Sequence, residues 1–175
     1  MSTESWLLNM DDAGITKAQT SGAFQLPRVY PGDYSVRFTV PPAYYVVDAM
    51  QQSQSVRNGG LKIGNGDVRV VLGMDGANVS GRVLWADDSP VPDAAVVLAR
   101  DDANRPLLTH TDQNGAYRFT AGVRPGRHHI AAPQELFESQ EQDGATLGRV
   151  AANGTALELN PRETKTLDLR VTPRH

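Results

Sequence analysis

The chain has 175 residues, a formal charge of −3 at pH 7 and no cysteine. The absence of cysteine excludes disulfide bonds, thiolate metal sites and cysteine nucleophiles. Because acidic and basic residues nearly balance, no basic surface is predicted and we expect no nucleic-acid partner. No apolar run approaches the roughly 18 residues that span a bilayer, so we expect no membrane insertion. The 16 glycines and 11 prolines predict many turns.

The first half of the chain has the pattern of short strands. Residues 1–14 lack a basic stretch followed by an apolar core, so no signal peptide is predicted. Ala23–Leu26 and Tyr34–Val40 place apolar residues two apart, which predicts strands with one buried face. The Pro31–Gly32 pair between them predicts a turn, because proline fixes φ and glycine adopts φ > 0.

The second half has the same pattern with more elements. Asn78–Arg100 predicts a strand, a proline-rich turn and a second strand. Asp112–Gly115 and Pro125–Gly126 predict two further turns. The best helical candidate is the short segment Pro133–Gly144. Together these elements predict an all-β fold.

The two halves are related by an internal repeat, in which Ser21–Val46 aligns with Asn114–Phe137. The aligned apolar and aromatic residues are predicted to fill a core, and the boundary between the copies is placed near Gly73–Ala77. The aligned pairs are Gly22/Gly115, Phe24/Tyr117, Leu26/Phe119, Val29/Val123, Pro31/Pro125, Gly32/Gly126 and Val36/Ile130.

The first copy is shorter than the second. It begins at Trp6, in the equivalent of the second strand of the later copy, so its opening strand is missing. A sandwich that lacks one strand has an unpaired edge, to which another strand can add. We therefore expect a piece of a longer tandem array, with neighbouring domains as partners, or a first unit whose open edge receives a strand from a partner.

The second copy resembles the carboxypeptidase regulatory-like domain over about residues 77–172, and the first copy matches partially over about 5–73. That domain is similar in fold to transthyretin (prealbumin) and to the B-type repeats of collagen-binding surface proteins. The resemblance is carried by Val79, Gly81, Val83, Val91, Pro92, Ala94, Val96, Leu98, Thr111, Asp112, Asn114, Gly115, Tyr117, Phe119, Val123, Pro125 and Gly126.

The resemblance implies tandem prealbumin-like Greek-key β-sandwiches: a partial one at residues 1–73, without its first strand, and a complete one at 77–175. It also implies a non-catalytic spacer, stabiliser or accessory module of an exported bacterial protein. Such a protein is secreted, periplasmic or associated with the outer membrane. Domains of this kind are attached to many unrelated proteins, so the resemblance indicates the fold more closely than the role.

The histidines do not form a zinc-peptidase pattern. None of His110, His128, His129 and His175 is followed three residues later by glutamate. His128 and His129 are neighbours on a predicted strand, so their side chains point to opposite faces and cannot chelate one ion. His128 occupies the position of Tyr34 in the repeat, which predicts a partly buried histidine in an aromatic core position.

Three aspartate pairs stand in turns at residues 11–14, 87–90 and 101–104. A calcium site needs six to eight oxygen ligands from a patterned loop. These pairs are adjacent and isolated, so they are interpreted as solvated turn residues. We expect no catalytic residue, no cofactor and no metal.

Exposed aromatic side chains are the remaining candidates for binding, because a flat apolar ring can stack on a sugar. Trp6 and Tyr30 are possible positions, and Trp85, Tyr44 and Tyr45 are the predicted carbohydrate contacts. The competing interpretation, which we favour, is that these rings pack within the sandwiches or their loops. The predicted function is a non-catalytic structural or accessory module, and the alternative is a carbohydrate-binding module with a polysaccharide partner.

Overall fold

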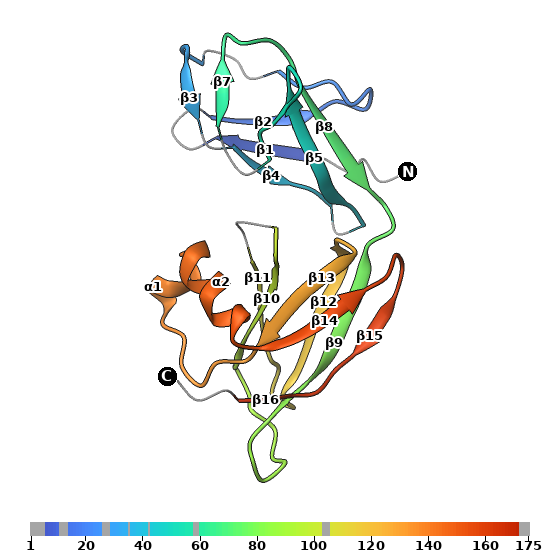
Figure 1. Ribbon diagram of the computed structural model, residues 1–175, viewed down its shortest axis with the longest axis vertical. Coiled ribbons are helices and arrows are strands. Elements are labelled where there is room, and N and C mark those ends of the chain that lie inside the picture. Colours follow the sequence, from blue (N-terminus) through green and yellow to red (C-terminus); the bar gives the residue numbers. More distant parts are fainter. Residues whose placement is uncertain are drawn as a thin grey trace. The chain divides into compact units, whose positions relative to one another are not determined.

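A computed structural model describes residues 6–10, 14–25, 29–34, 36–41, 43–57, 60–102 and 106–171. The chain divides into two compact units, Met1–Met74 and Asp75–His175. Strands dominate both units (Figure 1), which confirms the predicted all-β class.

The described residues of the first unit form three small sheets, with strand orders β2-β1-β4, β3-β7 and β6-β5-β8. The strand pairs in these three sheets are antiparallel. The strands are β1 (Trp6–Met10), β2 (Gly14–Ala18), β3 (Gly32–Tyr34), β4 (Val36–Thr39), β5 (Tyr45–Gln51), β6 (Gln54–Ser55), β7 (Leu61–Ile63) and β8 (Val68–Gly73).

The predicted strand Tyr34–Val40 is divided between two sheets. Its first part, β3, pairs with β7, whereas its second part, β4, pairs with β1. The predicted alternation is confirmed, because Tyr34, Val36 and Phe38 all pack in one core. The same face of the chain therefore stays buried although the hydrogen-bonding partner changes.

Two local predictions for the first unit are wrong. Ala23–Gln25 form no strand, and Leu26 lies outside the described residues; Phe24 still packs, partly buried, against the core. Gly32 does not adopt the predicted positive φ, because it is already the first residue of β3 and pairs with Ile63. Pairing with another strand fixes its conformation in place of the expected turn.

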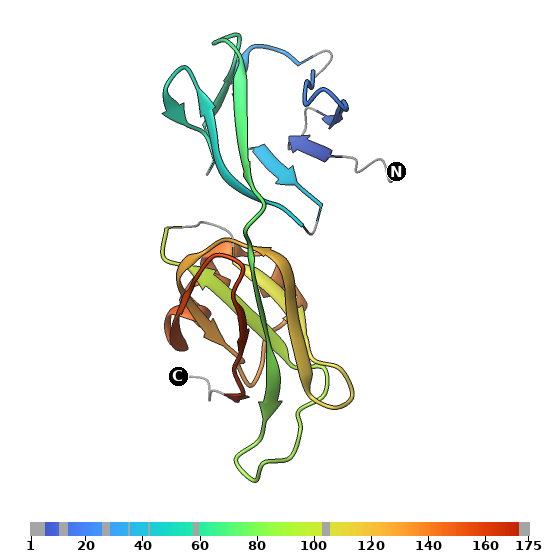
Figure 2. The ribbon, with the colours of Figure 1, turned by 90° about the vertical axis from the view of Figure 1, so that its right-hand side faces the viewer.

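The second unit is a sandwich of two sheets with two helices on one side (Figures 1 and 2). The sheets have strand orders β11-β10-β13-β14 and β12-β9-β15, and β15 and β16 both run parallel to β9. The elements are β9 (Ala77–Leu84), β10 (Ala95–Arg100), β11 (Leu107–His110), β12 (Ala116–Val123), β13 (Gly126–Ala131), α1 (Glu138–Glu141), α2 (Gly144–Ala152), β14 (Thr155–Leu159), β15 (Thr164–Thr166) and β16 (Leu169–Arg170).

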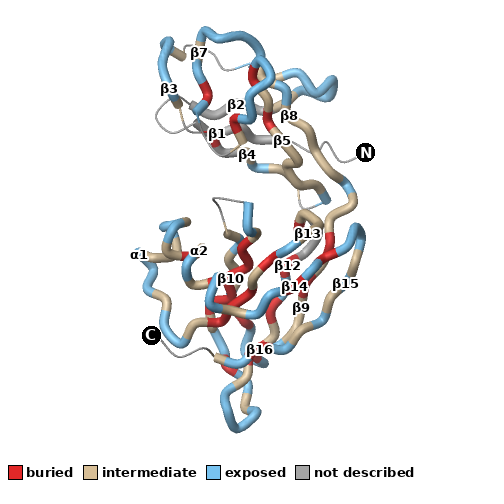
Figure 3. The backbone as a smooth tube through the Cα atoms, in the orientation of Figure 1, coloured by how far each residue is buried: buried red, intermediate tan, exposed pale blue. Residues whose placement is uncertain are grey.

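The core of the second unit lies between these sheets and contains side chains from both. Figure 3 shows the buried positions along their strands in red. Tyr117 and Phe119 meet edge to face with their ring centroids 6.1 Å apart, a favourable geometry for aromatic pairs. The predicted core positions of this unit are confirmed by their burial, and they are Tyr117, Phe119, Val123 and Ile130. Four residues that carry the family resemblance are buried in the same core: Val79, Val83, Val96 and Leu98.

Position 81 requires glycine because the backbone at Leu167 lies very close to it. A Cβ atom there would lie 1.9 Å from the carbonyl oxygen of Leu167. Leu167 lies between β15 and β16, where the chain changes from one parallel pairing with β9 to the next. The Val-x-Gly-x-Val pattern of β9 therefore combines two core valines with the one residue type that allows this crossing.

The predicted turn at Asp112–Gly115 is confirmed in detail. The Asp112 carboxylate accepts hydrogen bonds from the backbone N–H groups of Asn114 and Ala116, at 2.8 and 2.9 Å. Gly115 has φ +71°, and Gly126, in the second predicted turn, has φ +120°. Glycine tolerates these values because it has no Cβ.

The second unit contains more helix than the sequence predicts. Helix α1 lies within the predicted segment Pro133–Gly144, whereas α2, which follows it, is not predicted. Asp143 caps α2 by accepting a hydrogen bond from Ala145 N–H at 3.0 Å. Leu147 and Ala151 of α2 pack on the outer face of the β11-β10-β13-β14 sheet. The signal was present in the sequence as a capping aspartate followed by apolar residues four apart.

Candidate functional site

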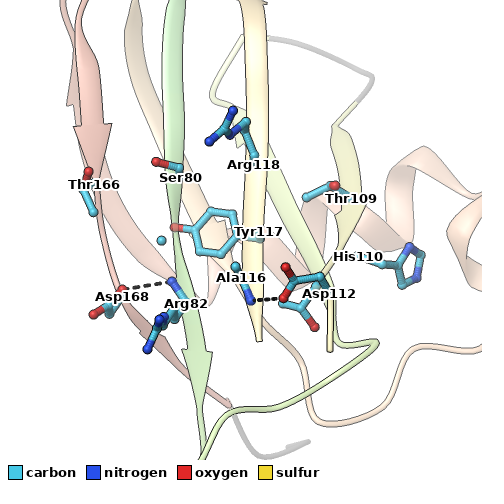
Figure 4. A pocket seen from close by; sticks show the side chains of 12 residues that line it. Ser80, Arg82, Thr109, His110, Asp112, Ala116, Tyr117, Arg118, Thr166 and Asp168 are labelled. Atoms are coloured by element: carbon cyan, nitrogen blue, oxygen red, sulfur yellow. Dashed lines mark hydrogen bonds between the residues drawn. The ribbon is translucent and has the colours of Figure 1, made fainter. Parts of the chain in front are cut away.

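A polar hollow of about 770 Å³ lies on the second unit and is called here the β9–β12 pocket (Figure 4). Ser80 and Arg82 enter it from β9, and Ala116 and Arg118 enter it from β12. These residues alternate along the strands with the buried core positions, so they lie on the opposite, solvent-facing side of the sheet. The predicted function did not include them.

Strand register brings these side chains together. Arg82 pairs with Ala116 and Ser80 pairs with Arg118 across β9 and β12. On the other side of β9, Thr166 of β15 pairs with Ser80. Paired residues share one face of a sheet, so the small Ala116 side chain leaves a hollow between the two longer arginines.

The rim of the pocket is formed by β11 and the turn after it. Thr109 and His110 come from β11, and Asp112 comes from the turn. His110 also contacts helix α1, because its Nε2 lies 3.1 Å from Oε1 of Glu141. The rim is therefore fixed both by the sheet and by the helix.

Tyr117 closes the floor of the pocket and is itself buried. Its hydroxyl donates a hydrogen bond of 2.6 Å to the Leu167 carbonyl oxygen. Burial raises the pKa of this phenol, and the negative charge of Asp168 raises it further. Tyr117 thus donates this hydrogen bond as a neutral phenol.

Trp85, one of the predicted carbohydrate contacts, lies in the loop after β9 and is 41% exposed. Arg170 holds this loop by donating a hydrogen bond of 2.6 Å from Nη1 to the Trp85 carbonyl oxygen. Ser89 N–H and Oγ–H both donate to Oδ1 of Asp87, which lowers the pKa of that carboxyl group. The indole is thus presented on a loop with several internal hydrogen bonds.

Tyr44 and Tyr45 belong to the first unit, and both are partly buried. The Tyr45 ring lies directly over Gly73, its partner on β8; a Cβ on that glycine would lie 2.2 Å from the ring. Tyr30 is 81% exposed, and the side chain of Trp6 is not among those described. The three predicted contacts are therefore divided between the two units.

The paired histidines lie on opposite faces of β13, as predicted. His128 is buried on the inner side, and its Nδ1 lies 2.9 Å from the Gly126 carbonyl oxygen. Burial lowers the pKa of this imidazole. His129 lies on the other face, with Nε2 3.3 Å from Oδ1 of Asp101.

Two of the predicted aspartate turns contain an aspartate that forms an ion pair with an arginine. Asp88 pairs with Arg170, and Asp102 pairs with Arg100. Within the described ranges, no three histidine, aspartate or glutamate side chains are grouped to hold a metal ion. Residues 11–13, in the first of these turns, lie outside the described residues. Among the described helices, none is long and apolar enough to cross a bilayer.

Solved structures of low sequence identity align with this chain. The Bacillus anthracis TIE protein is 12% identical with a TM-score of 0.38, and the alignment covers 95% of this chain and 30% of that one. A Streptococcal ancillary pilin is 11% identical with a TM-score of 0.35, covering 98% and 58%. BcpA, the major pilin subunit of Bacillus cereus, is 13% identical with a TM-score of 0.34, covering 95% and 54%. This chain thus spans less than two thirds of each.

No curated protein matches the chain. Residues 78–172, more than half of the chain, match the family described as the carboxypeptidase regulatory-like domain. The matched segment coincides with the sandwich from β9 to β16, in which Val79, Gly81, Tyr117 and Phe119 form the core and its close crossing. The chain therefore belongs to the carboxypeptidase regulatory-like domain family.

Proposed function

We propose that this chain is a non-catalytic structural or accessory module of an exported bacterial protein. The proposal rests on the structural roles of the residues that carry the family resemblance, because they pack the core or shape turns. Val79 and Phe119 are buried, Gly81 admits the Leu167 backbone, and Asp112 caps its own turn. A motif used in this way specifies a stable sandwich, which supports a structural role.

The same role is proposed for the first unit, as a partial copy of the second at residues 1–73, beside a complete copy at 77–175. Strand pairing supports this relation, because Gly32 faces Ile63 across β3 and β7 as Gly126 faces Leu159 across β13 and β14. Neighbouring domains of a longer chain are the proposed partners.

The strand pairing of β8 is relevant to the proposed partner that donates a strand to the first unit. Strand β8 is the last strand of the first unit, as β15 and β16 are the last strands of the second unit, where they pair with β9. In the first unit β8 pairs with β5 of the same chain. Strand β8 is the last strand in the sheet order β6-β5-β8, so among the described residues its other edge has no strand partner and can receive one. Sedimentation velocity over a range of concentrations tests the point, because strand exchange between copies would produce a dimer that grows with concentration.

The alternative function, carbohydrate binding, is favoured by the exposed Trp85 on its hydrogen-bonded loop. Titration of the chain with neutral polysaccharides, followed by tryptophan fluorescence and by affinity gel electrophoresis, separates the two functions. The structural role predicts no saturable response. Saturable binding that is lost in Trp85→Ala, Tyr44→Ala or Tyr45→Ala, and kept in the control Phe137→Ala, would establish the carbohydrate function instead.

A further inference from the structure

The β9–β12 pocket holds charged groups that the fold does not use. Arg82 and Arg118 are both exposed, and neither guanidinium group forms a hydrogen bond or ion pair with the described part of the chain. In Figure 4 the two side chains lie toward opposite ends of the hollow, and Ser80 lies beside Arg118 on the neighbouring strand. Two arginines therefore remain available to a ligand.

The acidic residues of the pocket do not neutralise these arginines by direct pairing. Oδ1 of Asp112 accepts from the backbone N–H groups of Asn114 and Ala116. Oδ1 of Asp168 accepts from the Arg82 backbone N–H at 2.9 Å, and this bond does not involve the guanidinium group. The Asp112 carboxylate thus stabilises the turn before β12 and the Asp168 carboxylate binds the backbone of β9, while the exposed arginines keep their guanidinium groups free of ion pairs with the described residues.

The remaining lining is rich in hydroxyl groups. Ser80, Thr109 and Thr166 contribute hydroxyls, each able to donate and to accept hydrogen bonds. The large ring in the lining belongs to Tyr117, which is only 3% exposed. The surface consequently offers many polar contacts and little apolar area.

We propose that the β9–β12 pocket binds a saccharide that carries carboxylate groups, such as an oligouronate. A carboxylate matches the planar fork of arginine with two parallel hydrogen bonds. Sugar hydroxyls both donate and accept, so they match the serine and threonine side chains and Asp168. The volume of about 770 Å³ falls within the range of about 300–1,000 Å³ that small-ligand pockets occupy.

An acidic peptide fits these observations less well. Peptides that bind sheets add along an edge strand and place side chains in pockets, and protein partners are anchored by buried aromatic or aliphatic groups. The pocket offers no exposed apolar side chain for such an anchor within its described lining. Trp85 is not among the residues that line the pocket. The proposed site is therefore distinct from the structural role proposed above and from the alternative of carbohydrate binding at Trp85.

The experiment is isothermal titration of the full chain with a short oligogalacturonate and with a neutral oligosaccharide of equal length. Arg82→Ala and Arg118→Ala are each expected to weaken oligogalacturonate binding by about tenfold or more, the usual effect of losing a charge-assisted hydrogen bond. The control Arg127→Ala removes the same charge from an exposed position on β13 and is expected to leave binding unchanged. Arg118→Lys, which keeps the charge without the fork, should bind with intermediate strength.

Circular dichroism of each variant confirms that the surface substitutions leave the fold intact. The proposal is overturned if the oligogalacturonate does not bind or if the neutral oligosaccharide binds equally well. Equal weakening by Arg127→Ala would show that the loss of binding depends only on net charge, and it would also overturn the proposal. A polyglutamate peptide that binds as tightly as the oligogalacturonate, with the same dependence on Arg82 and Arg118, would assign the site to acidic peptides.

Discussion

His128 shows how one residue couples the fold to pH. Its imidazole is buried on the inner side of β13, and burial lowers its pKa from the ordinary value of 6.5. The unfolded chain therefore binds a proton at a higher pH than the folded chain does. The stability that depends on neutral His128 is complete above about pH 6.5 and is lost progressively as the pH falls toward the lowered folded pKa.

The prediction is that His128→Phe flattens this dependence, because phenylalanine fits an aromatic position and cannot titrate. Urea unfolding between mildly alkaline and mildly acidic pH, followed by Trp85 fluorescence in a Trp6→Phe background, measures it. The wild type should lose more stability on acidification than the variant. Parallel curves for the two proteins would show that His128 does not contribute to the pH dependence.

Gln51 is a second buried polar residue, and its side-chain amide forms hydrogen bonds with the backbone around it. Its amide oxygen accepts from Lys62 N–H at 3.0 Å, and its amide nitrogen donates to the Lys62 carbonyl oxygen at 2.8 Å. Gln51→Leu would leave both Lys62 groups without these partners, so we expect a loss of about 1–3 kcal/mol in the free energy of unfolding of the first unit.

Urea unfolding monitored by Trp6 in a Trp85→Phe background measures this effect. The matched control is Gln54→Leu on β6, where the glutamine is exposed. An equal effect of the two substitutions would contradict the role assigned to the Gln51 amide.

At the scale of elements, the crossing of the β15–β16 segment over β9 depends on Gly81. Gly81→Ala would place a methyl group against the Leu167 carbonyl oxygen, in a position where backbone must move. Overpacking of this kind costs about 1–3 kcal/mol. Gly148→Ala in α2 is the control, because a Cβ there meets nothing within 4 Å.

Because alanine is the better helix former, Gly148→Ala is expected to stabilise the second unit by up to about 1 kcal/mol. The two glycine-to-alanine substitutions should thus shift the unfolding midpoint in opposite directions in thermal and urea unfolding. A midpoint unchanged by Gly81→Ala would mean that the crossing tolerates a side chain.

At the scale of the whole molecule, each unit has its own core. Among the described residues, the core cluster of the second unit is much larger than that of the first, so more apolar surface is removed from water there. We expect two unfolding transitions, with the first unit unfolding at the lower denaturant concentration. Trp6 and Trp85, observed separately in Trp85→Phe and Trp6→Phe variants, should report different midpoints. Coincident midpoints would indicate one cooperative unit.

The sequence by itself determined the features that depend on neighbouring residues. Alternating residues such as Tyr34, Val36 and Phe38 identified the buried faces, since side chains alternate along a strand. The aspartate and glycine of Asp112–Gly115 identified a turn by their own hydrogen bonds and positive φ. These local preferences act within a few residues, so they can be read directly from the chain.

The tertiary structure decided the features that depend on residues far apart in sequence. Arg82 and Arg118 share a pocket only because the register of β9 and β12 places Ser80 opposite Arg118 and Ala116 opposite Arg82. Pairing with β7 and β1 likewise divided one predicted strand into β3 and β4. Strand pairing satisfies backbone hydrogen bonds between distant segments, and no local pattern specifies which segments meet.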